Sequence, residues 1–166
     1  MYCILNTQQH TNTIHTNTMI NTHFIVRVQD GINFKNSKHP MWGVKAGLKG
    51  VVSNMKPGDI LWFVTNKQNN CLLVGMAEFV SMHDRRDEPL FSIHTYTNEE
   101  MGWSGNTDWC IQIHYKNLYF TEYHNIQIPL KGQNTIRYYK NCIDKIDKDL
   151  YAYYHGFKNF AIPMFT

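Results

Sequence analysis

The stretch MWGVKAGLKGVVSNMKPGDILWFVTN, Met41 to Asn66, holds the clearest succession of structural signals in this 166-residue chain. It closes on ILWFVT, residues 60–65, an apolar run with the length of a buried strand. The preceding KPGD, residues 56–59, predicts a tight turn because Pro and Gly favour turn geometry. Residues 44–55 predict a short helix that two glycines weaken. The stretch therefore predicts a helix, a turn and a buried strand in direct succession.

Short apolar segments on both sides of this stretch extend the same pattern. In DWCIQIHYKNLYF, for example, Trp109, Ile111 and Ile113 alternate with residues of the opposite face, as in a strand. Helical crossovers are too few for a doubly wound sheet, so we expect an α/β (α+β) fold, a curled mixed β-barrel with helices on its rim. Further strands are predicted at residues 23–28, 71–82, 108–120 and 125–130, with a hairpin tip at residues 67–70, a polar excursion at residues 84–107 and a helix within residues 142–160.

The length of the chain predicts one main domain. Residues 1–22 contain the repeat HTNTI-HTNTM, which is typical of an Asn/Thr-rich arm or an appended strand, and an arm that touches a ligand backbone is the functional alternative. We therefore divide the chain into this N-terminal segment, residues 1–22, and a domain of residues 23–166.

The composition disfavours several classes of protein. No apolar run is long enough to span a bilayer and the N-terminus does not read as a secretory signal, so we expect an intracellular protein without membrane contact. The formal charge of +3 permits nucleic-acid binding without demanding it. Nine histidines show no HxxxH or HxH spacing, which disfavours a metal site. The cysteines are scattered without a CxxC pair, so we expect reduced thiols: Cys3, Cys71, Cys110 and Cys142.

Catalytic motifs are missing from the sequence. It contains no GxSxG, P-loop or HExxH pattern. Cys110 and His114 are a conceivable nucleophile and base, but on a strand they lie some distance apart on one face, and packing explains Cys110 as well. The sequence therefore predicts neither a catalytic residue nor a cofactor.

Tryptophans beside loops are the best binding signal. Trp42, Trp103 and Trp109 each adjoin a glycine or an acidic residue, whereas Trp62 belongs to a buried strand. Recognition of a base outside a duplex needs an aromatic face for stacking, polar groups for the base edge and cations for phosphate. By pattern alone, core packing and an aromatic cage explain the three tryptophans equally well.

A family resemblance favours the cage. HFIVRV, then MWGVKAGLKGVVSNMKPGDILWFVTN, then LLVGMAEFVS resembles the EVE domain of the PUA-like superfamily, whose members show Trp-Gly-Val and a later Ser-x-Val-Lys-Pro-Gly-Asp. The matching residues here are Trp42 to Val44 and Ser53 to Asp59, with Met55 in place of Val. The order of motifs is also similar to that of YTH domains, through Arg27, Met41-Trp42, Gly75-Met76-Ala77, Trp103, Asp108-Trp109 and Arg137.

The resemblance implies a PUA-like barrel over residues 23–160 whose pocket receives a modified, typically methylated base, on DNA or RNA. Trp42 would form one wall of the pocket and Trp103 or Trp109 another, with the backbone of Gly43 and Val44 at the base edge. The hydrogen-bonding side chains implied are Ser53, Asn54 and Thr65, and the phosphate-binding ones are Arg27, Lys45, Lys49 and Arg137. Extrusion of a base costs a few kcal/mol, which a closed aromatic pocket must offset.

We therefore expect a non-enzymatic reader of a modified base. Two alternatives stay open. A PUA-like enzyme of the ASCH type would turn over nucleosides or RNA, and an adaptor would bind a protein through the Asn/Thr segment and residues 84–108.

Overall fold

The structure is a computed structural model that describes residues 22–89, 93–121, 136–139 and 162–164. The predictions for residues 1–21, for a strand at 125–130 and for a helix at 142–160 fall outside these described residues. The strands are β1 (His23–Arg27), β2 (Met41–Val44), β3 (Ile60–Val64), β4 (Leu73–Asp84), β5 (Ile111–Phe120), β6 (Ile136–Tyr139) and β7 (Ile162–Met164). The helices are α1 (Ile32–Asn36), α2 (Lys49–Val52) and α3 (Asn98–Met101), with 3₁₀ turns η1 (Ala46–Leu48) and η2 (Lys67–Asn69).

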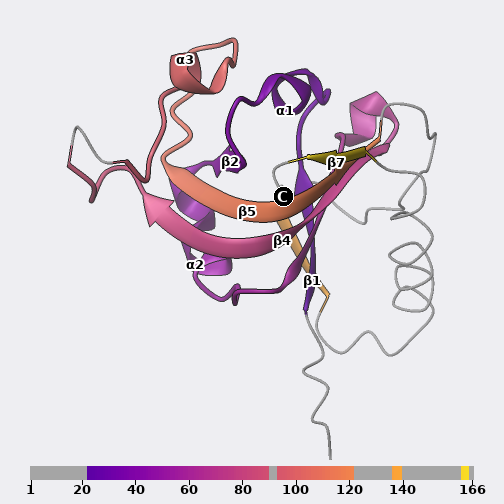
Figure 1. Cartoon of the computed structure of the whole chain (residues 1–166), viewed down its shortest axis with the longest axis horizontal. Coiled ribbons are helices and arrows are strands. Elements are labelled where there is room, and N and C mark those ends of the chain that lie inside the picture. Colours follow the sequence, from indigo (N-terminus) through magenta and orange to yellow (C-terminus); the bar gives the residue numbers. More distant parts are fainter. Residues whose placement is uncertain (1–21, 90–92, 122–135, 140–161, 165–166) are drawn as a thin grey trace, which may run out of the picture.

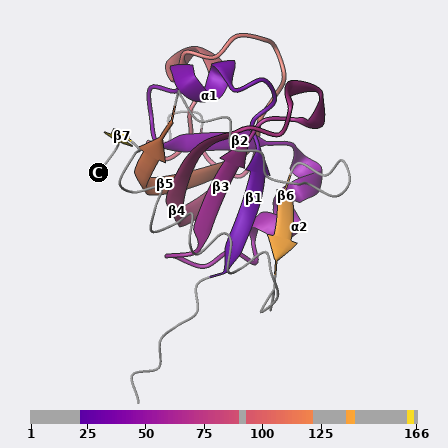
Figure 2. The same ribbon diagram turned by 90° about the vertical axis from the view of Figure 1, so that its right-hand side faces the viewer.

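One mixed sheet organises the fold. Its strands run in the order β2-β5-β4-β3-β1-β6, and β7 adds to β5. The pair β1 and β3 is parallel, and the remaining pairs are antiparallel. Figure 1 shows the long strands β4 and β5 bending together, and Figure 2 shows the sheet curling into a half-barrel. The expected α+β fold is confirmed as a curled mixed sheet with a few short helices, and the sheet closes to a half-barrel.

The curl has a local cause in β4 and β5. Their register shifts between Met76 and Glu78 and again between Phe79 and Ser81. On β5 the first shift coincides with Asn117, whose φ of 52° is left-handed. The side-chain Nδ2 of Asn117 donates a hydrogen bond to the Glu78 carboxylate at 3.3 Å. Asn tolerates that conformation better than most residues, and an extra residue in one strand increases the local bend and twist.

Both faces of the sheet are buried. Phe24, Val26 and Phe63 belong to a large core cluster inside the curl, whereas their neighbours Ile25 and Trp62 belong to a second cluster on the other face. The assignment alternates from residue to residue because successive side chains of a strand point to opposite faces. Every residue of β3 is buried, so the prediction of a buried strand at 60–65 is confirmed.

The predicted turn at residues 56–59 is confirmed, and Asp59 explains its geometry. Gly58 has a φ of 92°, a conformation that glycine adopts without strain. The buried Asp59 carboxylate accepts hydrogen bonds from the backbone N–H of Lys56 at 2.8 Å and of Thr22 at 3.1 Å. Asp59 therefore closes the turn and ties it to the chain that enters β1.

Two expectations need correction. The polar excursion at residues 84–107 is not wholly outside the core, because Met101 and Trp103 are buried in the large cluster. The strand predicted at 71–82 runs from Leu73 to Asp84, and the one predicted from residue 108 begins at Ile111.

Within the described part of the chain, no helix is long and apolar enough to cross a membrane.

Candidate functional site

The three candidate tryptophans gather at one end of the half-barrel, around β2 and the loop that leads into β5. This loop, residues 93–108, is called the Trp103 loop. It contains α3, which has a complete capping box. The Thr97 hydroxyl accepts from Glu100 N at 3.2 Å, and the Glu100 carboxylate accepts from Thr97 N at 2.7 Å. Gly102, with a φ of 76°, ends the helix and turns the chain toward Trp103. Local sequence thus fixes where the loop turns.

Trp42 and Trp103 lie against each other. Their ring centroids are 5.0 Å apart and the ring planes meet at 60°. Phe34 packs edge-on against Trp42 at 5.9 Å. Trp42 is 4% exposed and Trp103 is 7% exposed, so in this conformation the two rings fill the space between them.

The segment around α1 holds the loop that carries Trp103. The indole Nε1 of Trp103 donates to Ser37 Oγ at 2.8 Å, and Ser37 Oγ donates to the carbonyl of Asn33 at 3.0 Å. The Asn33 side chain accepts from Ser104 N at 3.0 Å and donates to the Ser104 carbonyl at 3.1 Å. The position of the Trp103 ring thus depends on polar contacts with a segment about 70 residues earlier in the chain.

Trp109 covers the glycine of the Trp-Gly-Val motif. A Cβ added to Gly43 would overlap Trp109 Cβ and lie 3.2 Å from Trp109 Cγ. Gly43 pairs with Gln112 on β5, so its missing side chain lets Trp109 cross β2 closely. The side of Gly43 that a ligand was expected to approach is therefore occupied by Trp109, and Val44 is 1% exposed.

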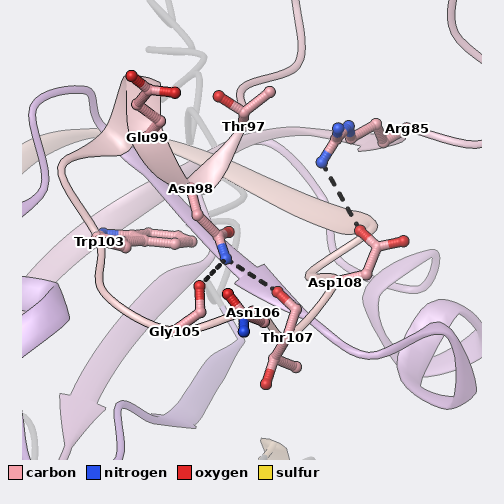
Figure 3. Close-up of a pocket in the computed structure, with 9 residues that line it drawn as sticks. All are labelled: Arg85, Thr97, Asn98, Glu99, Trp103, Gly105, Asn106, Thr107 and Asp108. Atoms are coloured by element: carbon pink, nitrogen blue, oxygen red, sulfur yellow. Dashed lines mark hydrogen bonds and ion pairs between the residues drawn. The ribbon is translucent and has the colours of Figure 1, made fainter.

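An open pocket of about 640 Å³ lies beside Trp103 (Figure 3). Asn98 lies in its middle and donates to the carbonyls of Gly105 at 3.2 Å and Thr107 at 3.0 Å, which braces the loop. Trp103 forms one side of the pocket, and the ion pair between Arg85 and Asp108, at 3.7 Å, forms the opposite side. The remaining lining residues are Thr97, Glu99 and Asn106. Amide and hydroxyl groups of this kind suit the hydrogen-bonding edge of a base or a sugar.

A second group of charges lies at the end of β4. The Asp84 side chain is 4% exposed and binds Arg86 through two hydrogen bonds of 2.9 and 2.7 Å, and Lys49 at 2.8 Å. Hydrogen bonds from Arg86 and then Lys49 outweigh burial and hold the pKa of Asp84 well below its usual range. Lys49 also pairs with Asp87 at 3.1 Å, and both carboxylates raise its pKa. Lys49, expected at phosphate, is thus paired with two carboxylates in this conformation.

The other candidate residues are spread over the fold. Ser53 and Asn54 are exposed after α2, where Ser53 Oγ donates to the Lys49 carbonyl at 2.7 Å. Thr65 is buried and ties the η2 turn together, donating to Asn69 O at 2.7 Å and accepting from Leu72 N at 2.8 Å. Ser53 and Thr65 thus make local structural contacts rather than contacts with the tryptophan pair.

Among the candidate phosphate ligands, Lys45 is exposed directly after β2, whereas Arg27 is buried. Arg137 pairs in register with Ile25 on the β1 side of the sheet. Sequence reasoning did not include Lys38, an exposed lysine whose side chain lies 3.1 Å from where a Cβ of Gly102 would be. Lys38 thus brings a cation next to the Trp103 loop. Lys38 immediately precedes His39-Pro40, and nothing in that stretch of sequence distinguishes it as a ligand-binding residue.

The sequence spacing also hid a histidine cluster. His83, His94 and His114, from β4, the following loop and β5, have ring centroids 4.9 to 5.0 Å apart along the two contacts that join them. No group of three or more potential ligands in the described residues is arranged to hold a metal ion. Cys110, considered as a nucleophile beside His114, is 4% exposed and belongs to the core.

The arrangement as a whole offers an aromatic pair, an open polar pocket beside Trp103, and one exposed lysine, Lys38, next to the loop that carries Trp103. A flat heterocycle can hydrogen-bond in such a pocket, whereas stacking between the two rings requires Trp103 to move away from Trp42. Comparison with protein-family models and with curated proteins finds no match for this chain.

Proposed function

We propose that this protein is a non-enzymatic reader of a modified, methylated base in DNA or RNA, built on a PUA-like curled barrel of the EVE type. The observation that carries the proposal is the contact between Trp42 and Trp103, at 5.0 Å, beside an open polar pocket. Two tryptophans from distant parts of the sequence meet where the Trp-Gly-Val motif and the Trp103 loop come together. The mixed half-barrel supports the choice of superfamily.

The two rings have different mechanical roles in this proposal. Trp42 belongs to β2, which is paired along β5, so it is the fixed wall. Trp103 belongs to a loop and is the movable wall. A base stacked on both rings needs van der Waals distance, about 3.5 Å, on each face, which is more room than the present 5.0 Å contact leaves. Base entry therefore requires Trp103 to move away from Trp42.

Base binding must offset the cost of this movement, which includes exposure of the Trp103 ring, now 7% exposed. Release of Trp103 breaks its hydrogen bond to Ser37, at a net cost of about 0.5–1.5 kcal/mol. Stacking returns about 1–3 kcal/mol per base, and a methyl group adds buried apolar area. Exposed Lys45 and Lys38 would neutralise phosphates outside the cage. The pocket itself has Glu99 and Asp108 against Arg85, so it suits a base or sugar better than a phosphate.

The test is binding of a panel of DNA and RNA oligonucleotides, each with one modified base, followed by tryptophan fluorescence and by anisotropy of a labelled strand. Leucine at position 42 or 103 keeps apolar volume and removes the stacking face. Trp42→Leu and Trp103→Leu should each weaken binding by roughly 5- to 150-fold, the equivalent of 1–3 kcal/mol. Trp62→Phe, on the opposite face of the sheet, is the matched control and should bind like the wild type.

Two results would overturn the proposal. The first is the absence of any preference for a modified over an unmodified oligonucleotide across the panel. The second is unchanged affinity in both leucine variants, provided that their circular dichroism and cooperative unfolding show them to be folded.

A further inference from the structure

The histidine cluster joins the sheet to the loop that carries Trp103. His83 stacks on His94 with centroids 5.0 Å apart and planes within 10°, and it meets His114 edge-on at 4.9 Å. His83 and His114 belong to the neighbouring strands β4 and β5, whereas His94 belongs to the loop. The His94 imidazole of the loop thus stacks on one strand histidine, His83, which in turn contacts the other, His114.

The same loop is fixed again two residues later, at Tyr96. The buried side chain of Gln112 accepts from Tyr96 N at 2.9 Å and donates to Tyr96 O at 2.7 Å. The Tyr96 ring stacks on His39 at 4.1 Å and lies 6.1 Å from the ring of His114. Thr97 then begins the capping box of α3, which leads to Trp103. Displacement of residues 94–96 would therefore reach the movable wall of the proposed cage.

Glu88 is a carboxylate in contact with the cluster, and Asp84 directly follows His83 on β4. His83 Nδ1 lies 3.1 Å from the Glu88 carboxylate, and His83 Nε2 lies 3.2 Å from the Ser81 hydroxyl. His114 Nε2 is buried, and the described residues give it no hydrogen-bond partner. Lys116 and Glu78 form the nearest charged register pair, further along β5 and β4. A proton added at His114 Nε2 would therefore create a buried donor without an acceptor among the described residues, with the His83 ring centroid 4.9 Å from that of His114.

The pKa of His114 indicates how acid affects docking of the loop on the sheet. Burial first, and then the neighbouring His83, lower its pKa from 6.5 to about 4, while a main-chain hydrogen bond of His94 opposes them. The docked loop supplies part of this burial, because the Tyr96 ring lies 6.1 Å from that of His114, and to that extent His114 binds fewer protons docked than undocked. Its contribution to docking is complete above pH 6.5 and is lost as the pH falls from there toward 4.

We propose that the His83–His94–His114 cluster is a proton-sensitive latch that holds the Trp103 loop, residues 93–108, on the sheet at neutral pH and releases it in acid. For its effect on ligand binding, the inference rests on the proposed function. Docking of the loop itself is independent of any ligand and can be measured without one.

The experiment follows the backbone amide of Tyr96 by ¹H–¹⁵N NMR in the ligand-free protein from pH 7.5 to 4.5. Loss of its hydrogen bond to Gln112 should shift this resonance between pH 6.5 and 5, while amides of β3 remain unchanged. In His114→Phe, and in the exposed-site variant His94→Phe, the transition should move to lower pH by half a unit or more. His23→Gln changes a histidine that contacts Trp62 instead, and it should keep the wild-type midpoint.

The inference is wrong if the Tyr96 amide does not respond above pH 5, or if the wild type and both phenylalanine variants share one midpoint. Because His94 is exposed, its variant keeps the test valid even if His114→Phe fails to fold. If the latch opens with pH but no modified base binds at any pH, the proposed function fails and the latch stands. If a base binds equally at pH 5 and 7.5 while the loop stays docked, the latch fails and the proposed function stands.

Discussion

Gly43 and Trp109 are in such close contact that residue 43 has no room for a side chain. A Cβ at this position would overlap Trp109 Cβ and come within 3.2 Å of both its Cγ and its carbonyl oxygen. Trp109 in turn packs against the large core cluster, and its carbonyl accepts a long hydrogen bond of 3.5 Å from the Gln112 side chain. Close packing against Trp109 thus explains why residue 43 of the Trp-Gly-Val motif is glycine, independently of any ligand.

Replacement of Gly43 by alanine should therefore destabilise the fold. The added methyl group forces Trp109 or β2 to shift, and overpacking of this kind costs about 1–3 kcal/mol of unfolding free energy. Gly47→Ala is the matched control, because a Cβ there meets nothing within 4 Å. That variant should leave the free energy within about 1 kcal/mol of the wild type, on the stabilising side. Urea unfolding followed by circular dichroism measures both, and equal midpoints for the two variants would contradict the rigid contact at Gly43.

Asp84 should be the most important for stability of the carboxylates grouped at the end of β4. It is buried and accepts hydrogen bonds from Arg86 and Lys49, so Asp84→Asn leaves two cations with a weaker partner. Hydrogen bonds to charged groups contribute about 1.5–3 kcal/mol, and we expect a loss in this range. Asp87→Asn, at an exposed partner of the same lysine, should cost less than about 1 kcal/mol.

The same residue gives a pH dependence. The pKa of Asp84 is lowered in the folded protein, so its contribution is present above its ordinary pKa of 3.8 and is lost as the pH falls below that value. The difference in urea midpoint between wild type and Asp84→Asn should be largest near neutral pH and should narrow below about pH 4. A difference that stays constant from pH 7 to pH 3 would show that charge is not its origin.

Tyr115 should tolerate the loss of its hydroxyl. Its ring packs against Phe63 at 5.0 Å, its side chain is buried, and among the described residues its hydroxyl has no hydrogen-bond partner. Tyr115→Phe removes an unsatisfied polar group, so the free energy of unfolding should stay equal or rise by up to about 1 kcal/mol. A loss above 1 kcal/mol would reveal a partner for the hydroxyl.

An alkaline titration adds an independent check on Tyr115. Burial raises the pKa of its phenol above the ordinary value of 10. The folded state therefore holds this proton longer than the unfolded state, and stability falls as the pH rises past 10. Tyr115→Phe should lose less stability than the wild type between pH 9 and pH 11, measured by urea unfolding at each pH.

The local parts of the fold could be predicted from the sequence. ILWFVT became a strand buried on both faces, KPGD became a turn closed by Asp59, and two glycines limited the intervening segment to short helical turns. These features depend on residues close in the chain, through apolar runs, turn propensity and glycine. The bounds of β4 and β5 were missed by two or three residues because tertiary pairing decides where a strand stops.

The site was only partly predictable. The three tryptophans do gather at one end of the sheet, but Ser53 and Thr65 serve local turns, and Lys49 is paired with acidic residues. Nothing near Thr65 in sequence shows that its hydroxyl is used by Asn69 and Leu72. A polar side chain beside a motif can face a ligand or brace a loop, and only its partners decide between the two.

The sequence by itself determined the strands, the turn and the choice of aromatic residues, because these follow from the burial and backbone preferences of neighbouring residues. Only the tertiary structure decided which aromatic rings meet. Trp103 reaches Ser37 across 66 residues, and His83, His94 and His114 converge without any motif spacing, because a curled sheet brings strand ends and a loop together. These long-range contacts depend on the bend of β4 and β5. The bend arises from register shifts that could not be predicted from the sequence.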